Sequence, residues 1–485
     1  MCLPFPTAGA AKTCVEYVTS PNRPDGMDTI PAEEIQIRIF QFHIPLYCVF
    51  VPTPKLRLAM LPIWNHAGMG ISSRRAEDAH PFLSQLRELE ASEEPSLQAG
   101  GDKAAATLLR LRERIAGLLE RTPSPRKVKV AADDIYLSQT GMASIFYAHS
   151  ALLKWSEAKT GAPGKTVMFG FPFHSTIHIF EHWGPGVKFL ALGTELEELE
   201  AYLESESQAG SPVQAVWTEL PSNPLLVSSD LVKLRELADK YRFALVVDDT
   251  IASFANVDVL PVADVVATSL TKSFSGYADV MGGSVALNPS GPLYNELKTV
   301  FNKHYRQELY YRDAEVLLSN SENYLARSAT LNQNATLLVD YLQSKAVDKT
   351  SSVSRLYYPT TQTTLANYDK FKRPATADFV PGYGCLFSVE FESVETITAF
   401  YDNLHVHCGP HLGAHRTLAL PYVRMLYGSE LEKVAPYDLR PTQLRVSVGL
   451  EASSELLAVF AHALSHADAV KAKAGKAAVP GKAAV

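Results

Sequence analysis

The sequence predicts an α/β protein built on a mainly parallel sheet, followed by a smaller C-terminal α+β domain. Between about residues 121 and 290, short apolar runs alternate with amphipathic helical stretches. These runs are continuously apolar, which is typical of parallel strands covered by helices on both faces. After about residue 331, strands such as 385–391 and 443–450 are mixed with helices instead. This change of pattern predicts a second domain.

Chain length and composition set the expected domain limits. The chain has 485 residues, 46% of them hydrophobic, so it exceeds the usual single-domain size and can bury a large core. The tail at 471–485 is rich in Ala, Lys and Gly and is predicted to be disordered. Before it we expect an N-terminal extension at 1–60, a large domain at 61–330 and a small domain at 331–470.

The elements follow from local patterns, taken in chain order. Residues 1–60 contain many prolines and no clear period, so we expect an extension that packs on a neighbour. Residues 83–121 predict two helices, the second with its leucines at helical spacing. Short apolar runs predict the strands that follow, and a polar cap predicts the start of the helix between them. These are strands at 214–220, 243–249 and 264–269, and a helix at 228–241.

Charge and cysteine content exclude several classes of protein. Lys and Arg total 45 against 52 Asp and Glu, a net charge of -7, which argues against a general nucleic-acid binder. No apolar run reaches the roughly 20 residues of a membrane helix, and the N-terminus has no signal-peptide pattern. The five cysteines are scattered and form no CxxC pair, so no metal site or disulfide framework is predicted. We therefore expect a cytoplasmic protein without nucleic-acid or membrane partners.

Three charged residues fall where the predicted parallel strands end. Ligands of such sheets gather at the carboxyl ends of the strands, and Glu219, Asp248 and Lys272 all lie there. A lysine shielded from water at this place suits a Schiff base, because desolvation lowers its pKa and frees the lone pair. Taken alone, a lysine at this place is more often a surface residue in a turn. Its neighbours decide between the two readings.

The neighbours of Lys272 predict an anion site and a cation partner. Ser269 and Thr271 offer hydroxyl donors, and Gly141 and Met142 open a helix whose first N–H groups attract anions. Asp248 ends an apolar strand, where a carboxylate needs a cation or a donor unless it caps a helix. Together these parts fit an aldehyde with a phosphate at one end and a protonated ring nitrogen at the other. That molecule is pyridoxal phosphate.

Several motifs resemble one family of pyridoxal phosphate enzymes. The run "WTELPSNPLLVSSDL … VVDDT … DVVATSLTKSFSGYADVMGGS" is similar to the Cys/Met-metabolism family, and "FGFPF … HWGPG" and "SSRRAE" resemble its fungal cystathionine γ-synthase-like branch. The resemblance covers roughly residues 60 to 465. It implies the aspartate-aminotransferase-like type I fold and a homotetramer, a dimer of dimers with active sites shared between subunits.

The resemblance also implies roles for individual residues. Lys272 would bind the cofactor and move protons, and Asp248 would hold the pyridine nitrogen protonated. Asn223 would hydrogen-bond the phenolic oxygen of the ring, and Arg445 would bind the α-carboxylate of the substrate. The implied phosphate ligands are Gly141, Met142, Ser269, Thr271 and, from the partner subunit, Arg74.

Three departures from the family pattern concern the substrate region. Phe173 stands where a tyrosine usually stacks on the cofactor, so the ring face remains but a hydroxyl is lost. A Tyr-x-Arg motif is replaced by Ser72 and Arg74, which changes one phosphate contact. His411, which is as compatible with a structural as with a substrate-binding role, lies where a Ser-Leu-Gly segment is usual. These changes suggest a retained catalytic core and an altered substrate region.

The resemblance implies γ-replacement on an O-acyl-L-homoserine, most simply O-acetyl-L-homoserine, through a vinylglycine-type intermediate. Cysteine as the nucleophile gives cystathionine. The alternative is C–C bond formation with a carbon acid such as a β-keto acid in specialised metabolism; sulfide addition and elimination reactions are further options on this scaffold. A non-catalytic pseudoenzyme is a third class of function. Intact Lys272, Asp248 and Arg445 argue against it.

Overall fold

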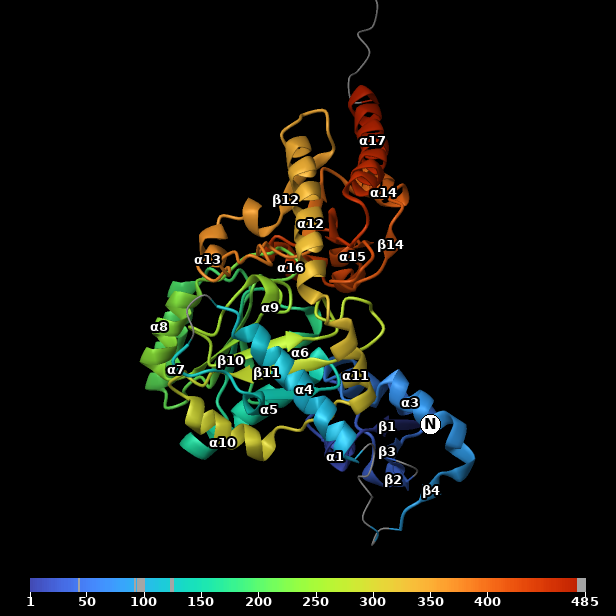
Figure 1. Cartoon of the computed structure of the whole chain (residues 1–485), viewed down its shortest axis with the longest axis vertical. Coiled ribbons are helices and arrows are strands. Elements are labelled where there is room, and N and C mark those ends of the chain that lie inside the picture. The colour runs from blue at the N-terminus through green and yellow to red at the C-terminus, as the bar shows by residue number, and fades with distance from the viewer. Residues whose placement is uncertain (42–43, 91–92, 94–100, 123–125, 478–485) are drawn as a thin grey trace, which may run out of the picture.

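The computed structural model describes residues 1–41, 44–90, 93, 101–122 and 126–477. The large domain forms the middle of the molecule in Figure 1, with the C-terminal domain above it and the N-terminal segment at its lower right. No helix in the described part of the chain is long and apolar enough to cross a membrane.

The large domain contains a seven-stranded sheet with the order β5-β11-β10-β9-β8-β6-β7. Strand β11 is antiparallel to both of its neighbours, and the other strand pairs are parallel. The mainly parallel sheet predicted from the apolar runs is therefore present. In chain order the strands are β5 (Ile135–Ser138), β6 (Thr166–Phe169), β7 (Val187–Leu190), β8 (Ala215–Glu219), β9 (Ala244–Asp248), β10 (Val265–Ser269) and β11 (Gly283–Leu287).

Successive side chains along the central strands belong to two cores on opposite faces of the sheet. In β9, Leu245 and Val247 join one core, whereas Ala244 and Val246 join the other. This is the period of two that a strand imposes, and it explains why strands buried on both faces read as continuous apolar runs. The first core packs against α4 (Gly101–Leu119), α7 (Leu196–Gln208), α8 (Leu231–Tyr241) and α11 (Tyr311–Asn320); the second packs against α1 (Ala8–Thr19), α5 (Gly141–Thr160), α6 (His174–His182) and α10 (Tyr294–His304).

The C-terminal domain has a five-stranded sheet with the order β12-β13-β16-β15-β14, covered by three helices. The predicted boundary at residue 330 falls inside the first of these helices, α12. Its Tyr324 packs in the large-domain core, whereas Leu338 and Leu342 pack in the small-domain core. The elements are α12 (Tyr324–Ala346), β12 (Val353–Tyr357), β13 (Leu386–Phe391), α14 (Val394–Asp402), β14 (His407–Cys408), β15 (Leu418–Leu420), β16 (Gln443–Ser447) and α17 (Ser453–Ala477).

The N-terminal segment is a folded layer and not a loose extension. Its sheet has the order β1-β3-β2-β4, and all the strand pairs are antiparallel. Phe5, Cys14 and Val18 are buried in the same core as the large-domain residue Trp217, so the layer packs on the large domain of its own chain. The strands are β1 (Cys2–Phe5), β2 (Gln36–Gln41), β3 (Pro45–Phe50) and β4 (Arg87–Glu88).

Two local predictions are corrected. Of the two helices expected in 83–121, the second is α4, but residues 83–88 form the end of a 3-10 helix and then β4, because this stretch pairs with β2. The rest of the first expected helix lies largely outside the described residues. The tail is helical through residues 471–477, where α17 continues, and Lys471 donates a hydrogen bond to the Ser351 carbonyl. Residues 478–485 lie outside the described part.

Candidate active site

A cavity of about 460 Å³ lies where the carboxyl ends of β8, β9 and β10 meet the first turn of α5 and a loop of the small domain. This volume is typical of small-molecule and cofactor sites. The predicted site residues that line it are Gly141, Met142, Phe173, Asn223, Asp248, Ser269, Thr271, Lys272 and Arg445. The chain positions that the sequence singled out separately are therefore brought together in one place.

Lys272 follows β10 and presents its amine to the cavity. Burial, followed by the positive charge of Arg445, lowers the pKa of Lys272 to about 8. A substantial fraction of the amine is therefore neutral near physiological pH, which is the form that attacks a carbonyl carbon. His411 Nδ1 lies within hydrogen-bond distance of Nζ, at 3.4 Å.

Asp248 is the last residue of β9 and also lines the cavity. Burial raises the pKa of its carboxyl group, and hydrogen bonds from Thr250 oppose this effect. The Thr250 N–H lies 2.9 Å from Asp248 Oδ1. Among the described residues Asp248 has no ion-pair partner, so a protonated ring nitrogen would supply the missing cation.

Glu219 is a second buried carboxyl group. From the sequence it was predicted only to lie at the end of a strand. It stands opposite Asp248 in the register of β8 and β9 and lines the same cavity. Burial and then the charge of Asp248 raise the pKa of Glu219 well above its usual range. The Phe173 N–H donates to Glu219 Oε1 at 2.6 Å. Because one of the two adjacent buried carboxyl groups is neutral, the cost of burying two like charges is avoided.

The first turn of α5 and the end of β10 form a closely fitted cradle. Thr140 caps the helix, with its Oγ1 accepting a hydrogen bond from the Ala143 N–H at 2.9 Å. The N–H groups of Gly141 and Met142 precede the first intrahelical bond and point out of the helix. A Cβ atom on Gly141 would lie 2.6 Å from Ser269 Oγ, so only glycine fits there. Thr140 was not predicted as a site residue, although a threonine before Gly-Met is a recognisable helix cap.

Ser269 and Thr271 occupy different positions in this cradle. The Ser269 N–H donates to Thr250 Oγ1 at 2.9 Å, and its side chain faces Gly141. Thr271 lines the cavity, but its hydroxyl donates to the Gly282 carbonyl at 3.2 Å and accepts from the Gly282 N–H at 3.1 Å. The Thr271 hydroxyl is therefore engaged by the backbone, and phosphate binding through it stays a prediction.

Arg445 comes from β16 of the small domain and crosses to the large domain. Its Nη1 donates to Asn223 Oδ1 at 3.0 Å, its Nη2 donates to the Pro410 carbonyl, and its guanidinium carbon lies 4.0 Å from the centre of the Tyr422 ring. Asn223 in turn donates to the Tyr422 hydroxyl at 3.3 Å. A buried guanidinium held in this way is oriented for a carboxylate. Tyr422 was not predicted from the sequence.

His411 contacts Lys272, although its neighbours Pro410 and Leu412, and not His411 itself, belong to the cavity lining. Burial, followed by the charges of Lys272 and Arg445, lowers the pKa of His411 to about 4. The imidazole is therefore neutral at pH 7, and Nδ1 can accept a hydrogen bond from the lysine. Its buried Nε2 has no hydrogen-bond partner in the described part of the chain.

Phe173 and Arg74 differ in their position relative to the cavity. Phe173 lines the cavity, and 37% of it is exposed, so its ring face is open to a ligand. Arg74 does not line the cavity of its own chain. It pairs with the buried Asp313, with 2.6 Å between Arg74 Nη1 and Asp313 Oδ1, and its Nη2 donates to the Asp279 carbonyl. Its role at a partner's phosphate stays a prediction.

These residues fit pyridoxal phosphate. A buried amine with a lowered pKa, a buried carboxylate without a cation and a helix N-terminus with a glycine-only contact surround one cavity. When bound, pyridoxal phosphate supplies an electron sink for charge that develops at the substrate Cα. The chain would hold its aldehyde carbon through Lys272, its ring nitrogen through Asp248 and its phosphate at the first turn of α5.

Comparisons with known proteins agree with this geometry. The family described as Cys/Met metabolism PLP-dependent enzyme matches residues 129–465, and the family described as fungal trans-sulfuration enzyme, N-terminal domain, matches residues 1–72. The chain is 38% identical to a cystathionine gamma-synthase-like enzyme, iboG1, of Amanita muscaria, with 87% of this chain and 77% of that protein covered. It is 37% identical to an alanine racemase, ungC, of Aspergillus violaceofuscus, with 85% and 72% covered.

A solved structure gives the same result for the fold. Cystathionine gamma synthase from Xanthomonas oryzae pv. oryzae, in complex with cystathionine, matches with a TM-score of 0.61 and 25% identity. The match covers 79% of this chain and 90% of that chain. The predicted α/β class and type I fold are therefore confirmed. The chain belongs to the Cys/Met-metabolism family of pyridoxal-phosphate-dependent enzymes.

Proposed function

We propose that the enzyme catalyses γ-replacement on an O-acyl-L-homoserine, with O-acetyl-L-homoserine as the first substrate to test and the thiol of cysteine as the nucleophile. The observation that supports this most directly is the position of Lys272 between the Asp248 side of the cavity and Arg445. Both the α-carboxylate of an amino acid and the proton on its Cα then have a partner in one cavity. Relatives and the solved neighbour named for cystathionine synthesis favour the same reaction.

Each part of the site has a task in this reaction. Arg445 binds the α-carboxylate, for which the guanidinium fork already points between Asn223 and Pro410. The neutral amine of Lys272 removes the Cα proton and then a Cβ proton as the acyl group leaves Cγ, and after the nucleophile has bonded to Cγ it returns protons to Cβ and Cα, as its pKa of about 8 allows. His411 Nδ1, 3.4 Å from Nζ, holds the amine in place and accepts a hydrogen bond from it.

A carbon nucleophile is the second candidate, and the cavity wall favours it. Phe173 has no hydroxyl to hydrogen-bond an incoming thiol or amine. The wall is otherwise largely apolar, and such a dry surface suits a carbon acid better than zwitterionic cysteine. Its apolar members include Trp64, Ile71, Met142, Ile145, Ile251, Met281 and Leu412.

The decisive experiment offers the purified enzyme O-acetyl-L-homoserine with cysteine, sulfide or acetoacetate and identifies products by mass. Cystathionine as the main product supports the proposal, and a C–C adduct supports the second candidate. L-alanine in deuterated water is assayed in parallel, because one relative is named an alanine racemase. Alanine racemisation without any γ-replacement would contradict both candidates. Matched Lys272→Ala protein shows which products need the site.

We further infer that the enzyme works as a homotetramer with shared active sites in the cytoplasm. Arg74 lies outside the cavity of its own chain, which supports sharing because the resemblance places this residue at the phosphate of the partner subunit. All five cysteines are free thiols, which fits a reducing compartment. Sedimentation equilibrium and microscopy of a fluorescent fusion test these two points.

A further inference from the structure

A group of four histidines lies outside the cavity, behind the wall that η3 and α6 provide. His174, His178 and His182 follow one another at intervals of four residues along α6, so they share one face of the helix. The fourth, His66, ends the π-helical segment η3 (Met60–His66). Its ring centre lies 4.7 Å from that of His178 and 6.0 Å from that of His182.

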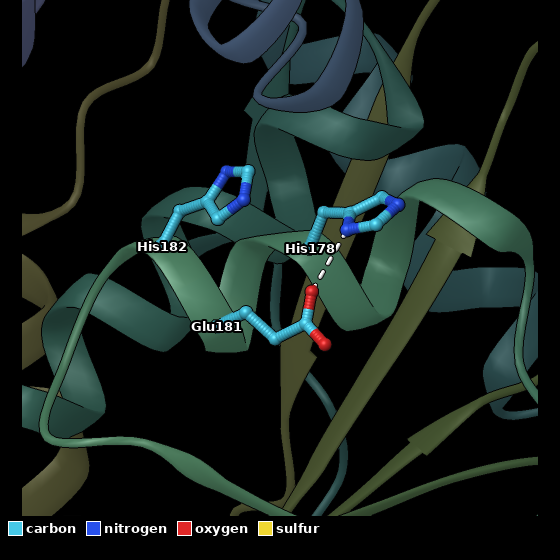
Figure 2. Close-up of side chains that lie close together, drawn as sticks. All are labelled: His178, Glu181 and His182. Atoms are coloured by element: carbon cyan, nitrogen blue, oxygen red, sulfur yellow. Dashed lines mark hydrogen bonds and ion pairs between the residues drawn. The ribbon is translucent and has the colours of Figure 1, made fainter. Parts of the chain in front are cut away.

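Two of these histidines and Glu181, from the same helix, converge as metal ligands do. Figure 2 shows His178, Glu181 and His182 projecting from α6, with the His178 Nδ1 and Glu181 Oε2 atoms joined at 2.8 Å. One ligand atom from each of the three lies within 4.8 Å of the other two. Zinc ligands at about 2.0–2.2 Å in a tetrahedron are about 3.4 Å apart, so side-chain rotations of about 1 Å would close the site.

Two histidines of the group have buried nitrogen atoms without a hydrogen-bond partner in the described part of the chain. His66 is buried, and within the described chain its Nδ1 and the Nδ1 of His182 have no hydrogen-bond partner. A neutral imidazole with a free lone pair is the form that binds a metal ion.

We propose that His178, Glu181 and His182, completed by His66, bind one divalent transition-metal ion of the zinc class. Imidazole nitrogens with one carboxylate suit zinc, whereas magnesium and calcium prefer oxygen ligands. Glu181 and His178 are partly exposed, which gives the ion a path from solvent. The ion links η3 to α6.

The link has a structural consequence at the active site. Trp64 and Asn65 line the cavity immediately before His66, and Phe173 and Thr176 line it on either side of His174. A metal between the two segments therefore fixes two parts of the same wall, including the ring that faces the cofactor site.

The test uses full-length holoenzyme without a histidine tag, dialysed against a chelator and titrated with Zn²⁺ by calorimetry. We expect one site per chain, no heat with Mg²⁺, and a visible ligand-field spectrum when Co²⁺ replaces Zn²⁺. The site should be lost in His178→Asn/His182→Asn and at least tenfold weaker in Glu181→Gln. Binding unchanged in His66→Gln would overturn the link between η3 and α6.

A matched control comes from α17, where His462 and His466 form an exposed pair with the same spacing. The variant His462→Asn/His466→Asn should keep the site. The proposal is overturned if the unmodified enzyme binds no Zn²⁺, or if the site survives the α6 double substitution. It is equally overturned if the α17 variant loses the site. Should the α6 double variant fail to fold, Glu181→Gln decides, because Glu181 is exposed and its replacement preserves the shape.

Discussion

Gly141 provides the most direct test of the proposed phosphate cradle. It is the first residue of α5, and a Cβ atom there would lie 2.6 Å from both Cβ and Oγ of Ser269. Ordinary contact begins near 3.4 Å, so the Gly141→Ala side chain is too close by about 0.8 Å. Ser269 is the last residue of β10 and cannot move freely, because its N–H donates a hydrogen bond to Thr250 Oγ1. The substitution should therefore distort the cradle itself.

The expected loss can be worked out from the cost of overpacking. Inserting a methyl group into a fitted site costs about 1–3 kcal/mol, which corresponds to about 5-fold to 150-fold weaker binding. We expect a loss of this size in the affinity of the apoenzyme for pyridoxal phosphate. Titration of apoenzyme with the cofactor, followed by absorbance, measures it.

Two further variants separate the cradle from general effects of alanine. Gly117 lies in α4 with no atom within 4 Å of an added Cβ, so Gly117→Ala should raise stability by about 0.5–1 kcal/mol and leave cofactor affinity unchanged. Ser269→Gly removes the two closest atoms, and the remaining contact is 3.1 Å to Cα. Gly141→Ala should cost less in that background. Equal affinity of Gly141→Ala and unmodified apoenzyme would refute the cradle.

Three other predictions concern the remaining site residues. Cofactor uptake by apoenzyme should accelerate as pH rises through about 8, because the neutral amine of Lys272 is the form that reacts. Arg445→Met should move the midpoint of this pH dependence upward, because the guanidinium lowers the pKa of Lys272. An unchanged midpoint would disprove the coupling between Arg445 and Lys272. Asp248→Asn should keep the cofactor but lose roughly 100-fold or more in turnover. Asp249→Asn should stay active, because Asp249 does not line the cavity and accepts a hydrogen bond from Thr268; equal losses would contradict the role of Asp248. Mixed Arg74→Ala and Lys272→Ala proteins should recover activity on subunit exchange, and no recovery after proven exchange would count against shared sites.

The sheet of the large domain was predictable because its signal is local. The strands at 214–220, 243–249 and 264–269 and the helix at 228–241 each have their own pattern, and β8, β9, β10 and α8 occupy those places. The N-terminal layer was not predictable in this way. Its strands β2 and β4 pair across more than forty residues, and such pairing leaves little trace in a short window.

The site was predictable where one strand end supplies the residue, and harder to predict where two domains meet. Lys272, Asp248 and Gly141 lie at element ends that the sequence itself marks. Thr140 is recognisable from the sequence only as a helix cap, and Tyr422 comes from the other domain, so neither was predicted at the site. The histidine spacing in 174–182 is visible in the sequence, but His66 comes from a separate segment, and only folding brings it to His178.

The two domains contribute different parts of the chemistry. Glu219 and Asp248 end two neighbouring strands and Lys272 follows the next strand, so the large domain alone would hold the cofactor. Arg445 and the segment from Pro410 to Leu412 come from the small domain and contact the large domain at Asn223, Lys272 and Ile251. A change in the small-domain segment can therefore alter the substrate while the cofactor stays in place. This division explains how relatives of one family, with the same fold, are named for both γ-synthase-like and racemase activities.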